Sequence, residues 1–575
     1  MYRILVLIIM LALSACGKEQ ESAGPAGAPD AAPAVERTPE PSFDVSVDRF
    51  ADVEVLRYEV PGFNELSLQE KKLAYYLSQA ALAGRDIIYD QNYEHNLRIR
   101  KLLSAIISTY GGDRDSDDFR NLVEYAKRVW FAHGIHHHSS MDKMLPEFSP
   151  DALVAMVAKS DESKLPLDEG QTQDELLRML RPVIFDPDVA PKRVTLDPGV
   201  DQVVNSATNY YDGVTAAEVE KFYAAKVNED PERPVSWGLN SQLAKVDGEI
   251  VERVWRIDGM YGPAIENIVH WLEKAATVAE NDLQKAWIDK LIKFYRTGDL
   301  RDFDEFNIAW VADTDSRVDA VNGFIEVYGD PIGYRGAWES VVSIRDLEAT
   351  DRIATIGANA QWFEDNSPIM DEHKKENVVG ISAKVITVVM QGGDLMHGST
   401  IGINLPNANW IRQEHGSKSV TLGNIREAYE IAAAAGGLTD EFAYTEEEKV
   451  RNKQYGALGS LLDVDMHEVI GHASGQINPG VGTPKETLKS YASALEEARS
   501  DLVAMYFIMD PKLVELGLMP SLDVGKTVYE SQIRNGLQYQ LRRVRLGDDL
   551  EQAHMRNRQL IAGWAYEMGQ EDNVI

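Results

Sequence analysis

Apolar side chains recur at helical spacing in several segments of the first half of the chain. A short helix is predicted over 174–180, and it is expected to end near Pro182, because proline cannot donate to the helical hydrogen-bond ladder. Residues 264–295 are rich in Ala, Leu and Ile and predict one or two long helices. Three further helices are predicted over 66–83, 97–108 and 117–130.

Elsewhere the period of the pattern changes. Residues 183–260 mix short apolar runs with Pro, Gly and Asp, which favours strands or irregular structure. Residues 379–390 are dominated by β-branched side chains, and with the following segment up to 405 they predict strands joined by turns. Beyond about residue 425 the pattern is helical to the end, and no internal repeat is present. The pattern therefore indicates an α+β fold.

The N-terminal end follows neither period. Arg3 precedes an apolar run over 4–13 that is too short to span a bilayer, which needs about 20 residues. The run ends in Leu-Ser-Ala before Cys16, the only cysteine in the chain, and this arrangement resembles a bacterial lipoprotein signal. We therefore expect residues 1–16 to be such a signal, with lipid attached at Cys16 and the protein exported to the cell envelope, on the periplasmic face and preferably at the outer membrane. The alternatives are an uncleaved signal anchor or a cysteine without a role.

The composition limits which molecules are plausible binding partners. Residues 17–45 are rich in Pro, Ala, Gly and Glu and predict a flexible tether, because they cannot bury enough apolar surface to offset chain entropy. The formal net charge of the whole chain is −34. That charge argues against nucleic acid as a partner and disfavours adsorption to anionic lipid, because both need clustered Lys and Arg. The length of 575 residues predicts two or more domains.

The segment 467–472 reads HEVIGH and carries the main chemical signal. His467 and His472 offer neutral nitrogen ligands suited to zinc, and Glu468 between them is placed to take a proton from a water. Residues five apart lie about 140° apart around a regular helix, so the two rings cannot meet one metal ion there. We therefore expect a local bulge that absorbs one residue, with Gly471 lowering its cost.

A third protein ligand is expected about 25 residues downstream. Residues 488–509 predict a helix, and the part over 495–501 reads LEEARSD. Its three carboxylates lie beside an apolar stripe, and one of them is the expected ligand. The remaining carboxylates are suited to orient the imidazoles through their second N–H. Read alone, the same residues would be a solvated acidic face.

A second histidine cluster is a weaker candidate for metal binding. Consecutive histidines cannot all face one ion in regular structure, and we find no suitable acidic partner for them. We expect these residues to line the substrate cleft instead. The cluster consists of His133, His136, His137 and His138.

Two motifs resemble those of the dipeptidyl peptidase III family. HEVIGH resembles the family's His-Glu-x-x-Gly-His motif, and EEARSD resembles its Glu-Glu-x-Arg-x-Asp/Glu motif. The resemblance implies one zinc ion per chain, held by His467, His472 and Glu497, with Glu468 as the general base. It also implies that Glu496 and Asp501 support the ligands from outside.

Three further blocks resemble the family's substrate cleft. They lie over 323–339, 402–407 and 552–555. The first implies a place for Glu326 near the substrate's amino terminus and for Tyr328 near the scissile carbonyl. The second implies that Asn404 and Asn407 bind the N-terminal end of the peptide, and the third offers His554 as another donor to the transition state. Read alone, each of these residues would be structural.

The resemblance also implies a fold. It predicts two lobes around a wide cleft, one mostly helical with the zinc ion and one mixed with a small β-barrel. The chain stops about 21 residues after His554, whereas the family continues well beyond this point. We therefore expect either a fragment or a C-terminally shortened variant. The expected division is a signal over 1–16, a tether over 17–45, the mixed lobe with the substrate-cleft segment over 46–345, part of the helical lobe over 346–385, a return to the mixed lobe over 386–425, and the helical zinc lobe over 426–575.

The sequence thus predicts a zinc metallopeptidase that releases dipeptides from the free N-terminus of short peptides. One alternative is another zinc peptidase, either an endopeptidase or an aminopeptidase. Another is a peptide-binding lipoprotein without activity, which the shortened C-terminus suggests. The intact Glu468 and the complete ligand set speak against the second alternative.

Overall fold

The computed structural model describes residues 43–570, apart from 227, 229, 379–380, 397, 436, 537–546, 548–549 and 551. The predicted signal with Cys16 and most of the predicted tether lie outside the described residues. Residues 44–575 form one compact unit, and the following description concerns that unit. Within the described part of the chain, no helix combines the length and the apolar character that a membrane span requires.

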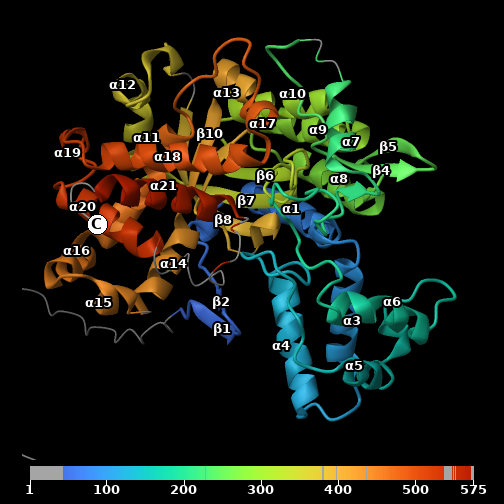
Figure 1. The fold of residues 1–575 in the computed structure, drawn as a ribbon. Helices are drawn as coiled ribbons and strands as arrows, with labels where there is room; N and C mark the ends of the chain where they lie inside the picture. The colour runs from blue at the N-terminus through green and yellow to red at the C-terminus, as the bar shows by residue number, and fades with distance from the viewer. Residues whose placement is uncertain are drawn as a thin grey trace, which may run out of the picture. The chain divides into compact units, whose positions relative to one another are not determined.

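A five-stranded mixed sheet occupies the middle of this unit (Figure 1). Its strands are β6 (Val318–Phe324), β7 (Trp338–Asp346), β8 (Ile381–Gly393), β9 (Gly402–Leu405) and β10 (Ser417–Leu422), in the order β6-β7-β8-β10-β9. Neighbours are antiparallel except β8 and β10, which run parallel. The described strands leave β6 and β9 as open edges, so the expected small β-barrel is not confirmed. The predicted strands over 379–390 and up to 405 are confirmed as β8 and β9.

The two faces of the sheet differ in character. Helix α1 (Leu68–Gly84) packs against β6, β7 and β8 on one face, where Trp338 is fully buried beside Gly84. A Cβ atom on Gly84 would lie 2.0 Å from the Trp338 ring, so glycine allows this close approach. Glu339, the next residue on β7, lines a large cavity instead, as strand alternation requires.

Helices with a core of their own follow α1. They are α3 (Asn96–Thr109), α4 (Asp117–Phe131), α5 (Pro150–Val157) and α6 (Gln173–Phe185); the short helix α2 (Ile87–Asn92), between α1 and α3, is not part of that core. The predicted helices over 66–83, 97–108 and 117–130 are confirmed as α1, α3 and α4. The predicted end near Pro182 is wrong, because α6 continues to Phe185. Proline removes one hydrogen bond, and the buried Val183 and Ile184 favour one more turn.

The segment between this group and the sheet is mixed. Residues 183–260 contain the strands β3 (Tyr211–Asp212), β4 (Ser241–Val246) and β5 (Glu249–Val254), and the helix α7 (Ala216–Ala224), which the pattern did not predict. A capping box between Thr215 and Glu218 begins that helix. The predicted one or two helices over 264–295 are two, α8 (Gly262–Ala276) and α9 (Asp282–Thr297), and α10 (Leu300–Ala312) follows. The N-terminal hairpin consists of β1 (Ser46–Phe50) and β2 (Val53–Leu56).

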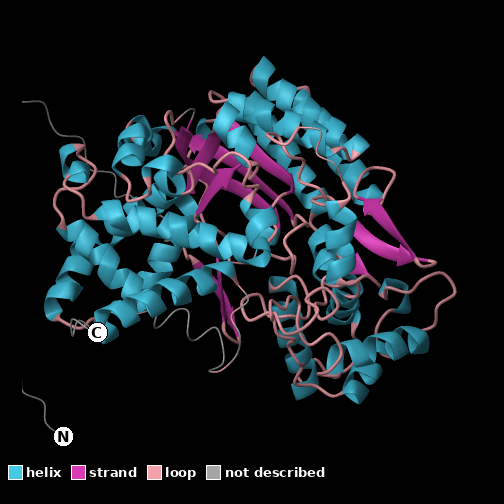
Figure 2. Ribbon diagram, turned by 45° about the horizontal axis from the view of Figure 1, so that its top comes forward, coloured by secondary structure: helices cyan, strands magenta, loops and turns pink. Residues whose placement is uncertain are grey.

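The rest of the chain is mainly helical, as predicted. Figure 2 shows helices on both sides of the central strands. Helices α16, α18 and α20 share an apolar core with α11 and α12. The two-lobe arrangement and the domain boundaries stay predictions. The helices are α11 (Leu347–Ala358), α12 (Ala360–Asn366), α13 (Asn409–His415), α14 (Gly423–Ala435), α15 (Leu438–Phe442), α16 (Glu446–Met466), α17 (Pro484–Leu488), α18 (Ala492–Ile508), α19 (Lys512–Glu515), α20 (Asp523–Arg534) and α21 (Ala553–Gly569).

Candidate metal centre and active site

A π-helical turn over His467–Gly471 follows α16 directly. The His472 N–H donates to the His467 carbonyl five residues back, at 3.0 Å, so the turn contains one extra residue. This turn brings the two imidazoles together, with 3.1 Å between their Nε2 atoms. Gly471 is needed because a Cβ atom there would lie 2.8 Å from the backbone oxygen of Ser500 on α18. The bulge expected from the sequence is confirmed.

Helix α18 adds a carboxylate to the two imidazoles. Glu497 Oε2 lies 3.4 Å from His467 Nε2, and the Glu497 side chain is almost completely buried. Burial alone would raise the pKa of this carboxyl, but the nearby imidazoles of His554, His467 and His472 outweigh it and hold the pKa well below its usual range. Glu497 is therefore charged at neutral pH.

The arrangement of these three groups fits a divalent metal ion. One ligand atom from each of His467, His472 and Glu497 lies within 4.8 Å of the others. A tetrahedral Zn²⁺ ion with bonds of about 2.0–2.2 Å separates its ligand atoms by about 3.3–3.5 Å, close to the distances found here. Glu497 Oε2 is buried and makes no hydrogen bond, although two imidazole nitrogens lie 3.3–3.4 Å away, so its lone pairs are available to a metal ion. Two imidazoles and one carboxylate are a donor set that leaves zinc one open position.

Two further carboxylates fix the imidazole rings from outside. Asp501 Oδ1 lies 2.8 Å from His467 Nδ1, and Glu496 Oε1 lies 2.9 Å from His472 Nδ1. Each carboxylate favours a proton on Nδ1, which leaves the Nε2 lone pairs directed at the proposed metal position. Arg499 donates to both oxygens of Glu496. Glu496 and Asp501 thus each contact one imidazole of the cluster.

Tyr328 and His554 reach the same cluster from outside the metal helices. The Tyr328 hydroxyl donates to Glu497 Oε1 at 2.9 Å, and His554 Nδ1 lies 3.3 Å from Glu497 Oε2. Burial and the nearby carboxylates raise the pKa of Tyr328 well above its usual value, so the phenol keeps its proton. Both side chains are therefore donors beside the metal cluster.

The expected substrate residues separate into two places. Asn407 Nδ2 donates to Glu326 Oε1 at 3.0 Å, and Arg412, which the sequence did not single out, lies 3.4 Å from Asn407 Oδ1. Burial raises the pKa of Glu326. Asn404 instead donates to the backbone carbonyl of Glu468 at 2.8 Å. The two asparagines are thus not a single unit.

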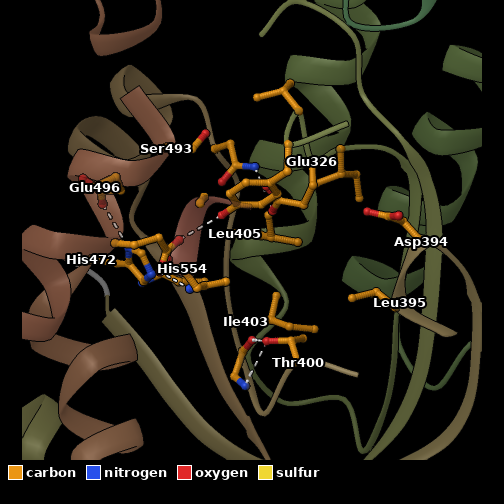
Figure 3. Close-up of a pocket in the computed structure, with 18 of the residues that line it drawn as sticks. Glu326, Asp394, Leu395, Thr400, Ile403, Leu405, His472, Ser493, Glu496 and His554 are labelled. Atoms are coloured by element: carbon orange, nitrogen blue, oxygen red, sulfur yellow. Dashed lines mark hydrogen bonds and ion pairs between the residues drawn. The ribbon is translucent and has the colours of Figure 1, made fainter. Parts of the chain in front are cut away.

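A single cavity connects these groups. Its volume is about 2520 Å³, and its lining includes the metal cluster, Glu468 and Glu326. Figure 3 shows His472, Glu496 and His554 on one side of the cavity and Glu326 and Asp394 on the other. Such a volume suits a peptide rather than a small metabolite.

The second histidine cluster lines this cavity in part. His133 and His138 belong to the lining, as expected. His136 is buried, and desolvation lowers its pKa to about 3. His137 forms an ion pair with Asp52 at 2.9 Å. Within the described part of the chain, the metal-binding geometry occurs at His467, His472 and Glu497 alone.

Comparison with known proteins points to one family. Residues 239–479 match the model of peptidase family M49. Dipeptidyl peptidase 3 of Mus musculus is 23% identical over 573 residues, covering 88% of this chain and 76% of that protein. The Homo sapiens protein of the same name is 23% identical over 543 residues, covering 83% of this chain and 72% of that protein.

Solved structures show the same fold. The DPP III structure from Caldithrix abyssi has a TM-score of 0.62 and 22% identity, and the match covers 88% of this chain and 82% of that one. The dipeptidyl-peptidase III structure from Corallococcus sp. strain EGB has a TM-score of 0.65 and 21% identity, and the match covers 92% and 81%.

Proposed function

We propose that this chain is a zinc-dependent metallopeptidase of the dipeptidyl peptidase III family, peptidase family M49, and that it releases dipeptides from the free N-terminus of short peptides. One observation carries this proposal. The Tyr328 hydroxyl contacts the metal cluster through Glu497, while Glu326, two residues earlier on the same segment, lines the same cavity.

Glu326 and Tyr328 are close in the chain, since two extended residues span about 7 Å. Both line the same cavity. We propose that a peptide whose ammonium group is held at Glu326 presents its second peptide bond to Tyr328 and the metal cluster. A carboxylate that accepts a free ammonium group excludes blocked N-termini, because an amide there carries no charge.

The metal ion would be held by His467, His472 and Glu497. When bound, zinc supplies a Lewis acid and lowers the pKa of an attacking water. Glu468 lies beside the cluster, with Oε1 4.0 Å from His467 Nε2. Its carboxylate accepts a proton from the water and later delivers this proton to the leaving nitrogen.

The developing negative charge on the carbonyl oxygen requires donors. The phenol of Tyr328 and the imidazole of His554 approach Glu497 from two different elements and are suited to turn towards the substrate carbonyl. At the other end, Glu326 accepts the ammonium group, and Asn407 holds Glu326 in place. Asn404 belongs to the cavity lining, and its Oδ1 atom has no hydrogen-bond partner in the described part of the chain, so we propose this atom as an acceptor for a substrate N–H.

The location of the protein is a separate proposal. The signal-like sequence before Cys16 supports a lipid anchor that holds the enzyme at the cell envelope. Short peptides are the proposed substrates in that compartment.

The test is mass spectrometry of products from a free pentapeptide and its N-acetylated twin, with zinc added. We expect a dipeptide from the free peptide alone and no product from Glu468→Ala. Cleavage of both peptides would indicate an endopeptidase, and release of single residues an aminopeptidase. Zinc binding without cleavage would favour a peptide-binding role and overturn the proposal.

A further inference from the structure

The backbone carbonyl of Glu468 is held by the sheet. A π-helical turn displaces the regular ladder of helical hydrogen bonds, so its carbonyls become available to other donors. The Glu468 oxygen accepts from Asn404 Nδ2 at 2.8 Å and from Ser419 Oγ at 3.1 Å. A carbonyl oxygen has two lone pairs, and these two donors occupy both.

The two donors act as one unit. Asn404 on β9 and Ser419 on β10 are directly opposite each other in the antiparallel register. Asn404 Nδ2 also donates to Ser419 Oγ at 2.8 Å. The serine hydroxyl accepts a hydrogen bond from the asparagine and donates one to the Glu468 carbonyl. Both side chains are buried, so bulk water does not compete for these bonds.

The neighbouring cross-strand pair contacts the same turn. Gly402 and Thr421 are opposite each other one rung along the same face. The Thr421 hydroxyl donates to Asp465 Oδ1 at 2.6 Å, on the last turn of α16. At Gly402 an added Cβ atom would lie 2.3 Å from Glu468 Oε1, so the Glu468 carboxylate occupies the space that a side chain would fill.

We propose that Asn404 and Ser419 are positioning residues for Glu468: they fix its backbone carbonyl so that its carboxylate extends over Gly402 into the cavity. The proposal rests on the proposed function only in that Glu468 is the general base. Neither residue needs to touch the metal or the scissile bond. Ser419 lies 49 positions before Glu468, and its hydroxyl contacts the backbone carbonyl of Glu468, not its carboxylate.

The relation between sheet and helix explains why the contact matters. Glu468 lies between two metal ligands, on a turn whose hydrogen bonding is irregular. Misplacing a reacting group by about 1 Å costs about 100-fold in rate. The two side-chain hydrogen bonds fix the position of this turn relative to the sheet. Strand β10, which carries Ser419, is itself held by hydrogen bonds to β8 and β9.

The test compares Ser419→Ala with Ser417→Ala. Ser417 is on the same strand and face, is equally buried and makes no side-chain hydrogen bond to the turn. Each variant is assayed with the peptide that the parent enzyme cleaves, whichever bond that is, so that the choice of bond is judged separately. Zinc content and kinetic constants are measured for each.

We expect Ser419→Ala to lower kcat by about 10- to 100-fold, with KM within about twofold of the parent and the zinc content unchanged. Ser417→Ala is expected to keep the parental kcat. Ser419→Thr retains the hydroxyl and should recover most of the activity. A parental kcat in Ser419→Ala, or an equal loss in Ser417→Ala, would overturn the proposal.

Two further measurements test the proposal without relying on the kcat of the serine variants. Gly402→Ala leaves the hydrogen bonds to the Glu468 carbonyl intact but displaces the Glu468 carboxylate. It should therefore reproduce the loss of kcat with zinc retained. In the metal-free protein, amide hydrogen exchange over 468–473 should be faster in Ser419→Ala than in Ser417→Ala. Equal exchange in the two variants would show that the hydroxyl does not hold the turn.

Discussion

Tyr328 donates a hydrogen bond to Glu497 over 2.9 Å, although the two residues are 169 positions apart in the chain. One belongs to the loop between β6 and β7, and the other to helix α18 of the metal cluster. The contact couples the segment that carries Glu326 to the metal-binding helices. A change at either residue is therefore expected to affect both the metal cluster and the loop that carries Glu326.

Replacing Tyr328 tests the role of its hydroxyl. Tyr328→Phe is expected to lower kcat about 100-fold, because one donor to the oxyanion is lost, while zinc affinity changes little. Steady-state kinetics and metal titration measure both. Tyr334→Phe, in the same loop and outside the cavity lining, is the matched control and should behave like the parent. A kcat within threefold of the parent in Tyr328→Phe would remove this residue from the mechanism.

The carboxylates behind the imidazoles set the strength of metal binding. Glu496→Gln and Asp501→Asn are each expected to weaken zinc binding by about 10- to 100-fold, because the neutral amide no longer supports the charge on the imidazole. Competition with a chromogenic chelator gives the dissociation constants. Glu515→Gln, at an exposed position on α19, should leave them unchanged. Unaltered affinity in both variants would contradict the proposed support.

Gly471 is the tightest point of the π-helical turn. In Gly471→Ala the new Cβ atom meets the backbone of Ser500, which cannot move as a side chain can. We expect a loss of about 1–3 kcal/mol in stability and weakened zinc binding, because the two helices must separate. Thermal unfolding of the metal-free and zinc-loaded protein measures both effects. Gly563→Ala, on α21 with open space around it, is the control and should not destabilise.

Asp304 predicts a pH-dependent term in stability. Burial raises its pKa from 3.8 to about 7, against the attraction of Arg301. The folded state therefore holds a proton that the unfolded state releases above pH 4, and stability falls as the pH rises from about 4 to about 7. Asp304→Asn removes this loss. Its free energy of unfolding relative to the parent should therefore rise over that range by up to about 4 kcal/mol, seen as a higher melting temperature.

The pKa of Asp302, on the same helix, is shifted in the opposite direction to that of Asp304. Burial opposes ionisation there, but the contacts with Lys293 and Thr297 outweigh it and lower the pKa of Asp302. Asp302→Asn should therefore be less stable than the parent by an amount that is already complete near pH 4 and stays constant at higher pH. Melting curves of both variants from pH 4 to pH 8 separate the two cases. A parallel response of the two variants would refute the assignment of Asp304.

The metal cluster could be predicted because its chemistry is local in the sequence. His467, His472 and Glu497 lie within two neighbouring helices, and the helical repeat alone required a bulge between the histidines. Residues such as Arg412 and Ser419 gave no signal, because an ordinary arginine or serine acquires its role from partners that only the folded sheet brings close.

Other differences have physical causes as well. Pro182 ends a helix by local rules, but the tertiary core beyond it favoured another turn. Asn404 and Asn407 form a pair in the sequence, yet strand β9 ends between them, so they bind different groups. The β-branched run predicted strands but not the partner of each edge, so the expectation of a small barrel depended on the family resemblance alone.

The short chain segment between the metal ligands has a consequence for folding. His472 and Glu497 are 25 positions apart, so bringing them together closes a small loop at little entropic cost. An ion bound there would act as a clamp on the turn and on α18 before the distant cavity wall from β6 to β9 is assembled. The availability of the ion where the chain folds would then influence how quickly it leaves the unfolded state, apart from any role in hydrolysis.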